Sequence, residues 1–352
     1  MRKYITAALI VAPSLVAAQW TPQQSNTNAE FRGLIALSPN VVWASGTRGR
    51  VARTTDGGKT WMIDSIPGAY GLDFRDIDAR SATVAHAMSA GEAEKGQAKI
   101  YRTTNGRTWA KQFETTEKGV FLDAISFWDN QHGIAFGDPI AGRLFLLATE
   151  NGGATWTRIP TENAPPMLPG EAAFAASGTC ITVQGAANVW IGTGGAARAR
   201  VFRSTDRGRT WAVADAPVHA GNSAAGIFSI AFRDAMHGVV VGGEYSSPHA
   251  PFDNVALTSD GGKTWRRASG ALPVGYMSGV AFIPETNGRS LVAVGLGGTA
   301  TSIDGGESWT MVDTVGYNSV AFASKSDGWA VGPRGRIARW TPPPPANKPP
   351  HL

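Results

Sequence analysis

The chain has a single cysteine and only a small excess of positive charge. Cys180 is the one cysteine among 352 residues, so no disulfide can form within the chain. It lies in an alternating apolar run, GTCITVQG, with no flanking motif, so we expect a buried structural thiol rather than a nucleophile. The formal net charge is +5, without the concentrated basic stripe and stacking aromatics of a nucleic-acid binder. The sequence therefore predicts no nucleic-acid partner.

Common catalytic and cofactor motifs are absent as well. The chain contains neither G-x-S-x-G nor H-E-x-x-H. GTGGAA at 192–197 fits G-x-G-x-x-A, but it joins two predicted strands and opens no helix, as a dinucleotide site requires. The six histidines are scattered along the chain, so no metal cluster is evident. We expect neither a cofactor nor a metal, and a redox enzyme has no support.

The two ends of the chain differ from the rest. Residues 1–18 have a basic start, an apolar middle and a small-residue end, which predicts a secretory signal peptide cleaved after Ala18. The alternative is an uncleaved anchor, but the apolar run is short for a membrane span. Residues 341–352, TPPPPANKPPHL, predict a disordered or polyproline tail. We expect a periplasmic or secreted protein with one domain over 19–340, no membrane anchor after cleavage, and a monomeric state.

A polar turn ending in tryptophan recurs six times, and we call it the turn motif. The steps between successive tryptophans are 48, 47, 55, 54 and 44 residues, a period typical of propeller blades. The second copy lacks one residue, so its turn should be tighter. The copies are 54–61 (TTDGGKTW), 103–109 (TTNGRTW), 149–156 (TENGGATW), 204–211 (STDRGRTW), 258–265 (TSDGGKTW) and 302–309 (SIDGGESW).

The segments between turn motifs predict four-stranded blades. Residues 121–156 show three alternating apolar runs before the motif, and the chain after Trp156 supplies a fourth strand. Six motifs define six blades. Residues 319–340 give only three strands of a seventh, and QWTPQQSNT at 19–27 resembles the strands that follow the motifs. We therefore predict an all-β, seven-bladed propeller of antiparallel blades that is closed by an N-terminal strand.

The turn motif has a structural explanation. Its hydroxyl residue and its Asp can bond the free backbone groups of the turn, and its Trp should pack where neighbouring blades meet. The alternative is a metal or sugar site at each turn. The residues given the structural role are Asp56, Trp61, Trp109, Trp156, Asp206, Trp211, Asp260, Trp265, Asp304 and Trp309.

The motif resembles the Asp-box, or BNR repeat, of sialidases, sortilin-type receptors and photosystem II assembly factors. The blade pattern VVWASGTRGRVARTTDGGKTW, with its echoes VWIGTGGAARARVFRSTDRGRTW and GWAVGPRGRIARW, is most similar to the Ycf48-like group of secreted bacterial propellers. This resemblance covers nearly all of the mature chain. It implies a scaffold that binds another protein, as an assembly factor does, and needs no cofactor.

Arginines gather in the segments expected on one face of the ring. Loops between second and third strands, and segments entering each blade, would place them there, which suits an envelope protein or an acidic ligand. The alternative is that they are solvated loop charges or pairs between blades. The candidates for partner binding are Arg32, Arg48, Arg50, Arg75, Arg143, Arg198, Arg200, Arg334 and Arg336.

Carboxylates in the blade-entry segments are the candidates for catalysis. Glu171, Asp76 and Asp123 would converge near the central channel, either for acid–base chemistry or to satisfy the arginines. The rival function is a sialidase-like glycoside hydrolase, with Tyr245 beside Glu244 as a nucleophile pair. The segment FRGL departs from the sialidase Phe-Arg-Ile-Pro pattern after two residues, and a sialidase should have six blades.

Overall fold

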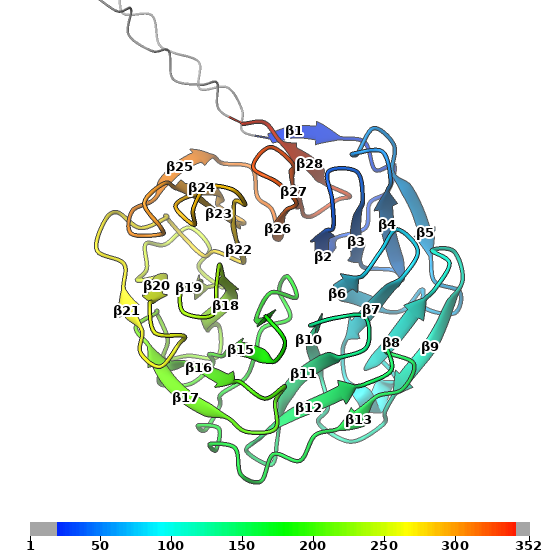
Figure 1. The fold of residues 1–352 in the computed structure, drawn as a ribbon, viewed down its shortest axis with the longest axis horizontal. Coiled ribbons are helices and arrows are strands. Elements are labelled where there is room, and N and C mark those ends of the chain that lie inside the picture. The colour runs from blue at the N-terminus through cyan, green and yellow to red at the C-terminus, as the bar shows by residue number, and fades with distance from the viewer. Residues whose placement is uncertain (1–19, 343–352) are drawn as a thin grey trace, which may run out of the picture.

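The computed structural model describes residues 20–342, and the structural statements below refer to that range. Its strands form seven four-stranded antiparallel sheets around a common axis, which confirms the seven-bladed propeller (Figure 1). The described helical structure is one short 3-10 turn, Ala93–Lys95. None of the described helices has the length and hydropathy needed to cross a membrane. The predicted signal peptide and nearly all of the predicted tail lie outside the described residues.

Within blades 1 to 6 the strands run outward from the axis in chain order, and each blade follows the last around the ring. Blade 1 consists of β2 (Phe31–Ala36), β3 (Val42–Gly46), β4 (Arg50–Thr54) and β5 (Met62–Ser65). Blade 2 consists of β6 (Asp73–Ala79), β7 (Ala85–Ala90), β8 (Lys99–Thr103) and β9 (Trp109–Glu114). Blade 3 consists of β10 (Leu122–Phe127), β11 (Gly133–Ile140), β12 (Arg143–Thr149) and β13 (Thr157–Arg158). Blade 4 consists of β14 (Ile181–Gln184), β15 (Asn188–Gly192), β16 (Ala199–Ser204) and β17 (Ala212–Ala216). Blade 5 consists of β18 (Ala225–Phe232), β19 (Gly238–Glu244), β20 (Val255–Thr258) and β21 (Arg266–Arg267). Blade 6 consists of β22 (Gly279–Phe282), β23 (Leu291–Gly295), β24 (Gly298–Ser302) and β25 (Thr310–Asp313).

The seventh blade is closed by the N-terminal segment, as predicted. Strands β26 (Ser319–Phe322), β27 (Gly328–Val331) and β28 (Ile337–Trp340) are completed by β1 (Trp20–Gln23), which pairs with β28 at the outer edge. Trp20 pairs with Trp340, and its indole donates to Thr299 Oγ1 of blade 6 at 3.0 Å. The two ends of the described chain therefore lock the ring together.

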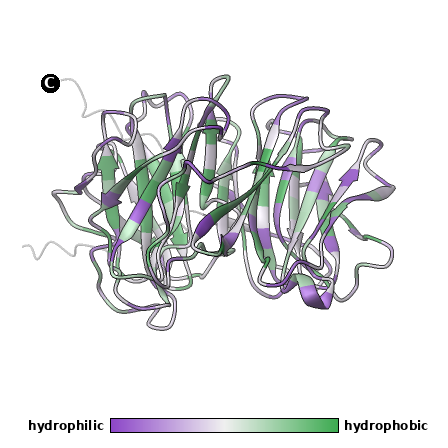
Figure 2. Cartoon of the chain, turned by 90° about the horizontal axis from the view of Figure 1, so that it is seen from below, coloured by the Kyte–Doolittle hydropathy of each residue, from purple (hydrophilic) through white to green (hydrophobic). Residues whose placement is uncertain are grey.

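The ring has two faces, which we name by their connections. The motif face carries the six turn motifs between third and fourth strands and the turns between first and second strands. The loop face carries the loops between second and third strands and the connections between blades. In the edge-on view, hydrophobic residues concentrate in the strands between the two faces (Figure 2). The core is thus a ring of packed sheets, with polar loops on either side.

The turn motifs have the predicted internal hydrogen bonds. In the first, Thr54 Oγ1 accepts from the Gly58 N–H at 2.9 Å, and Asp56 Oδ1 accepts from the Thr60 N–H at 3.0 Å. Hydrogen bonds from Thr60 lower the pKa of Asp56 to about 2, with a further contribution from Thr54. In the second motif Gly106 binds the threonine only three residues before it, which confirms the tighter turn.

The motif tryptophans pack where blades meet. Each lies in the hydrophobic cluster shared by its own blade and the preceding one; Trp309, for example, packs among residues of blades 5 and 6. Trp109 begins its fourth strand, whereas the other five stand just before theirs. Their burial differs: Trp309 is 4% exposed, whereas Trp265 is only partly buried. Trp20 takes the same place between blades 6 and 7, although no motif precedes it.

Candidate functional site

A cavity of about 520 Å³ lies on the axis of the ring at the loop face, and we call it the axial cavity. All seven blades line it. The lining side chains include two arginines, three carboxyls and several aromatic rings. The axial cavity therefore offers charged, hydrogen-bonding and apolar groups to a ligand. The lining residues are Glu30, Arg32, Arg75, Phe121, Asp123, Asp138, Ala172, Ala173, Phe174, Ala175, Ala176, Ser223, Phe228, Tyr245, Tyr276, Leu296 and Asn318.

Bulges in the innermost strands place side chains in the axial cavity. The pairing with the second strand skips one residue in four blades, and the skipped residues are Arg32, Arg75, Asp123 and Phe228. A bulge leaves the extra residue out of the ladder and redirects its side chain. All four skipped residues line the axial cavity. The same local irregularity, repeated around the ring, therefore builds the site.

The chain that enters blade 4 extends into the middle of the ring, and we call residues 171–180 the axial segment (Figure 1). Arg32 donates to the Ala176 carbonyl at 3.1 Å, and Arg75 donates to the Ala175 carbonyl at 3.3 Å. On the opposite side, Ser177 Oγ donates to the Ser278 carbonyl at 2.7 Å. Blades 1, 2 and 6 thus hold the axial segment, which forms part of the cavity wall.

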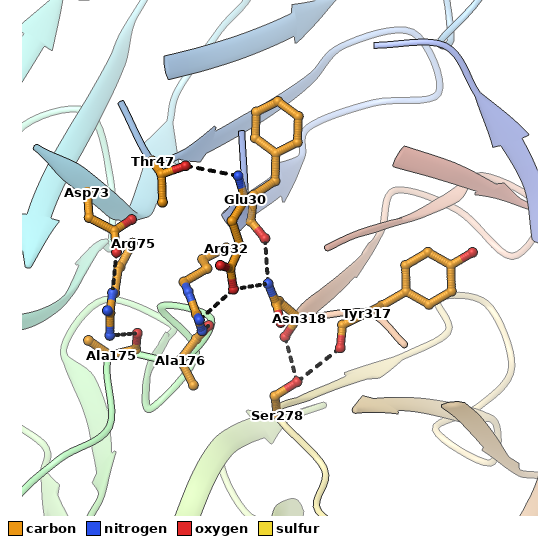
Figure 3. A network of polar contacts seen from close by, with 11 residues as sticks. Glu30, Arg32, Thr47, Asp73, Arg75, Ala175, Ala176, Ser278, Tyr317 and Asn318 are labelled. Carbon is orange, nitrogen blue, oxygen red and sulfur yellow. Dashed lines mark hydrogen bonds and ion pairs between the residues drawn. The ribbon is translucent and has the colours of Figure 1, made fainter. Parts of the chain in front are cut away.

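A polar network links the first blades to the last (Figure 3). Glu30 Oε1 accepts from Arg32 at 2.6 Å and from Asn318 Nδ2 at 3.3 Å. Asn318 Nδ2 also donates to the Phe31 carbonyl at 2.9 Å, and Ser278 Oγ donates to the Asn318 carbonyl at 2.8 Å. The network crosses the junction where the chain ends meet, so it orients Arg32 and ties blades 6, 7 and 1 together.

Two carboxyls of the axial cavity are held in unusual surroundings. Burial raises the pKa of Asp123 well above its usual range, and the neighbouring Asp138 raises it further. Burial also raises the pKa of Asp138, whose Oδ1 accepts from the Ala173 N–H at 3.2 Å. Asp123 Oδ2 has no hydrogen-bond partner among the described residues. Protonated carboxyls could donate hydrogen bonds to a bound group.

Aromatic rings form the other side of the axial cavity. Phe174 of the axial segment stacks on Phe228 with ring centroids 3.9 Å apart. Phe228 also makes an edge-to-face contact with Tyr276 at 4.6 Å, and Tyr245 leans over both phenylalanines from the long loop of blade 5. Tyr245 is half exposed and Tyr276 is buried. The cavity therefore has a charged side from blades 1 to 3 and an aromatic side from blades 4 to 6.

The nine candidate arginines fall into groups with different surroundings. Four are exposed: Arg48, Arg143, Arg198 and Arg334. Arg48 and Arg334 lie in matching loops of blades 1 and 7, both with positive φ (62° and 57°), and neither side chain forms an ion pair or hydrogen bond with another described residue. Arg198 pairs with Asp215 at 2.7 Å.

Four of the other five candidate arginines bind within the fold. The fifth, Arg50, is partly buried and has no polar side-chain partner in the described part of the chain. Arg32 and Arg75 pair with Glu30 and Asp73 beside the axial segment. The remaining two donate to backbone carbonyls of connecting segments, Arg200 to Pro166 and Arg336 to Gly316. The exposed Arg143 likewise donates to the carbonyls of Glu162 and Ala164.

Two of the predicted acids lie outside the axial cavity. Glu171 is fully buried and bound by Arg200, Thr193 Oγ1 and the Leu168 N–H. Asp76 follows the bulged Arg75, so it points between blades 2 and 3 and accepts the Ile125 N–H at 2.7 Å. Asp76 therefore does not converge with Asp123 at the central channel as expected, because the residue of blade 2 that matches Asp123 is Arg75.

The Glu244–Tyr245 pair is also split by the structure. Tyr245 lines the axial cavity. Glu244 instead accepts hydrogen bonds from Ser246, His219 and Asn222 at the rim, and these bonds lower its pKa to about 2. Glu244 is the last residue of β19 and Tyr245 begins the following loop, and only Tyr245 of the two lines the axial cavity.

Sequence reasoning missed several residues of the axial cavity. Asp138, Phe174, Phe228 and Asn318 line it, although none was a candidate. A signal was present for two of them. In several blades, the residue that follows a buried apolar residue at the innermost strand faces the axis. Phe228 follows Ile227 in GIFSIA, and Asn318 follows Tyr317 in GYNSVA. Asp138 and Phe174 carried no such signal, because they come from a strand end and from the axial segment.

No group of three or more His, Cys, Asp or Glu side chains within residues 20–342 is arranged to hold a metal ion. In comparisons with known proteins, no family model and no curated protein matches the chain. Solved structures do match it in fold. One described as YCF48 bound to D1 peptide has a TM-score of 0.64 at 15% identity, covering 94% of this chain and 99% of its own.

YCF48 from Cyanidioschyzon merolae also gives 0.64, at 18% identity, covering 92% of this chain and 99% of that one. An ancestral GH74 enzyme gives 0.61 at 15% identity, covering 90% of this chain and 45% of that one. At these identities the likeness concerns the fold. The chain is thus similar in architecture to YCF48 over nearly its whole length, as the blade pattern predicts.

Proposed function

We propose that the protein is an exported binding scaffold that docks an acidic segment of a protein partner on its loop face. The segment would lie across the ring and place part of its chain in the axial cavity. Export is proposed from the predicted signal peptide at residues 1–18. The six turn motifs are proposed to be Asp-boxes in the structural sense, holding the blades rather than binding the partner.

The observation that carries this proposal is the convergence of all seven blades on one cavity of about 520 Å³. Binding sites of propellers and similar rings form where loops from many blades meet around a rigid frame. The cavity offers a charged side with Arg32 and Arg75 and an aromatic side with Tyr245 and Tyr276. A peptide with both acidic and apolar side chains would match this division.

Exposed arginines at the rim supply the electrostatic part of the proposal. Arg48 and Arg334 stand on adjacent blades, free of other described polar partners. A guanidinium group that is not already paired can form a bidentate contact with a carboxylate. Arg32 and Arg75 already hold the axial segment, so we assign them a positioning role. A solved structure of the same fold, described as YCF48 bound to D1 peptide, supports a protein partner as the first class to test.

One observation favours a second candidate, a glycoside hydrolase. Asp123 and Asp138 are neighbouring carboxyls with raised pKa values in the axial cavity, and a general acid needs a raised pKa. Substrate turnover would be tested with a panel of fluorogenic glycosides. Turnover that is lost in Asp123→Asn or Tyr245→Phe would favour the hydrolase and contradict a purely binding role.

The binding role is tested with a library of random peptides panned against the protein. We expect selected peptides to be enriched in Asp and Glu and to carry apolar residues. Their association should slow when Arg48 and Arg334 are both replaced by Ala, because charge at the rim speeds encounter. Peptides without acidic enrichment, or equal binding to the double variant, would contradict the proposed arginine contacts.

A further inference from the structure

A second cavity, of about 510 Å³, lies on the motif face at the junction of blades 3 and 4, and we call it the junction groove. It is separate from the axial cavity and shares none of its residues. We propose that the junction groove binds a ring-shaped organic carboxylate about the size of one sugar unit. This proposal is independent of the function proposed for the loop face.

Ala148 of blade 3 lines the groove at a third-strand position that varies among the blades, being Leu257 in blade 5 and Thr301 in blade 6. Four blades carry arginine at this position of the third strand, namely Arg53, Arg102, Arg203 and Arg339. Arg53 lies over the Trp43 ring at 5.0 Å and donates to the carbonyl of Ala82 in the turn of the next blade. At the junction of blades 4 and 5, which Arg203 lines, the corresponding cavity is only about 200 Å³.

A second departure from the repeat faces the same groove. Four turn motifs place glycine at the first left-handed position: Gly57, Gly152, Gly261 and Gly305. The motif of blade 4 places Arg207 there, with φ of 61°. A non-glycine residue in this region is strained, and such strain is often retained where a side chain has a function. Arg207 lines the junction groove.

Trp128 is a third departure. It is the residue whose N–H closes the turn between the first and second strands of blade 3, bonding the His132 carbonyl at 3.0 Å. The residues making the equivalent bond in other blades are Leu37, Arg80, Arg233, Ile283 and Ala323, none of them aromatic. With Ile159 and Pro160, the Trp128 ring gives the groove an apolar wall.

The charges of the groove favour an anion. Three arginines line it, Arg158, Arg207 and Arg209, against a single carboxylate, Glu150, which is largely exposed. Arg158 is engaged by Glu117. Arg207 forms an ion pair with Asp129 at 3.7 Å, and Arg209 forms one with Glu150 at 3.8 Å; both distances are too long for a hydrogen bond. Within the described chain, Arg209 donates no side-chain hydrogen bond and Arg207 donates only through Nε, to the Ala186 carbonyl.

Size and chemistry together define the ligand class. A cavity of this volume is in the range of small-molecule sites, which run from roughly 300 to 1,000 Å³. Guanidinium groups recognise carboxylates, and an apolar wall with a small residue at its base accepts a ring. A sugar acid and an aromatic acid share these features. The two sources are distinguished by the probes of the experiment.

The test measures binding of glucuronate and of benzoate by saturation-transfer NMR, with glucose and benzyl alcohol as uncharged counterparts. We expect saturable binding of at least one of the two acids with a Kd of about 1 mM or tighter, the range open to so small a ligand. The uncharged counterparts should bind at least about tenfold more weakly. Preference for glucuronate identifies a sugar acid, and preference for benzoate identifies an aromatic acid.

Three variants locate the site. Ala148→Arg restores the arginine of the sister blades and should fill the groove, while Arg207→Gly restores the glycine of the sister turns. Arg209→Ser removes a guanidinium without touching the packing. Each should weaken binding about tenfold or more, Ala148→Arg by occupying the space of the ligand and the other two by the loss of one charged contact. Thr301→Arg places an arginine at the matching position of blade 6, away from the groove, and should leave binding unchanged.

The thermal stability of Arg207→Gly separates a ligand-binding role from a structural one. Relief of the strained backbone should leave its melting temperature unchanged or higher, even though binding is lost. A lower melting temperature with intact binding would make Arg207 a structural residue and overturn the proposal. The proposal would also be overturned if neither acid bound at about 1 mM, or if the wild-type chain, Ala148→Arg and Arg209→Ser bound the acids equally well.

Discussion

The two faces of the ring satisfy their polar groups in different ways. On the motif face each turn is self-contained: Asp56 and Thr54 bond the backbone of their own turn, and the equivalent residues do so in the other five copies. On the loop face the axial cavity joins side chains from distant parts of the chain. There Arg32 Nε and Asp123 Oδ2 remain without a partner among the described residues.

This difference separates stability from recognition. Local hydrogen bonds and a buried tryptophan can be repeated in every blade, so they maintain the ring wherever they occur. Buried polar atoms without a described partner occur at the indole nitrogens of Trp156 and Trp265 as well as at Asp123, so the two faces differ in whether a turn bonds itself or depends on distant parts of the chain. The junction groove lies on the motif face, where Arg207 replaces the glycine of four other turn motifs.

The largest expected effect comes from opening the ring. Removing Trp20–Asn28 deletes β1, exposes the edge of β28 and removes the contact of the Trp20 and Trp340 rings, whose centroids are 5.0 Å apart. We expect a loss of at least about 3–5 kcal/mol, the usual cost of one buried tryptophan. Circular dichroism melting and light scattering would show a lower melting temperature and aggregation. Unchanged stability would contradict closure by this strand; removing 343–352 is the control.

The motif tryptophans should differ in proportion to their burial. Trp309→Ala removes a ring that is 4% exposed and whose indole donates to the Gly306 carbonyl at 3.0 Å. We expect a loss of about 3–5 kcal/mol in denaturant unfolding. Trp265→Ala should cost less, because that ring is only partly buried and its indole nitrogen has no described partner. Equal losses would mean that burial does not set the contribution of the motif.

The loop face should respond to charge without a change in stability. Combined replacement of Arg48, Arg198 and Arg334 by Ala should slow association with a selected acidic peptide and reduce its salt dependence, with an affinity loss of about tenfold. Surface plasmon resonance at several salt concentrations measures both effects. Arg107→Ala and Lys263→Ala, which change charges in turn motifs on the other face, are the matched controls. Equal losses in both sets would indicate diffuse attraction only.

The smallest effect should be a difference in pH dependence between interior and motif carboxyls. Burial raises the pKa of Asp78 to about 7, which is above the value of about 3.9 for an unfolded Asp. The folded chain therefore holds its proton more tightly, so this contribution to stability is full below about pH 4 and is lost as the pH rises to about 7. Asp78→Asn should flatten the dependence of unfolding free energy on pH in that window.

Asp56 should act in the opposite direction. Its pKa is lowered to about 2, so its contribution to stability is present above about pH 4 and is lost as the pH falls through about 2. Asp56→Asn is a matched control, because Asn105 and Asn151 already fill this position in two motifs. It should change only the acid limb of the urea-unfolding profile. A change between pH 4 and 7 would contradict the assignment.

The local sequence predicted much of the fold. Turn residues and tryptophans reveal the blade period, and the similarity of 19–27 to strands that follow a motif predicts the closing strand. The candidate site was predicted only in part. Arg32, Arg75, Asp123 and Tyr245 do meet in the axial cavity, whereas Glu171 is held by Arg200 and Asp76 points between blades. The difference arises because a bulge shifts the alternation of side chains by one residue.

The sequence by itself determined the chemistry of the turns, because each turn motif bonds within itself, and it determined the number of blades, because the motif recurs once per blade. It also marked the closing strand, because 19–27 resembles the strands that follow the motifs. Only the tertiary structure decided what lies on the axis. Residues 171–180 carry no repeat signal, and they enter the channel because Arg32, Arg75 and Ser177 bond across it. Likewise, Ala148 and Arg207 are 59 residues apart in the sequence and share no local pattern. They line one groove only because blades 3 and 4 pack together.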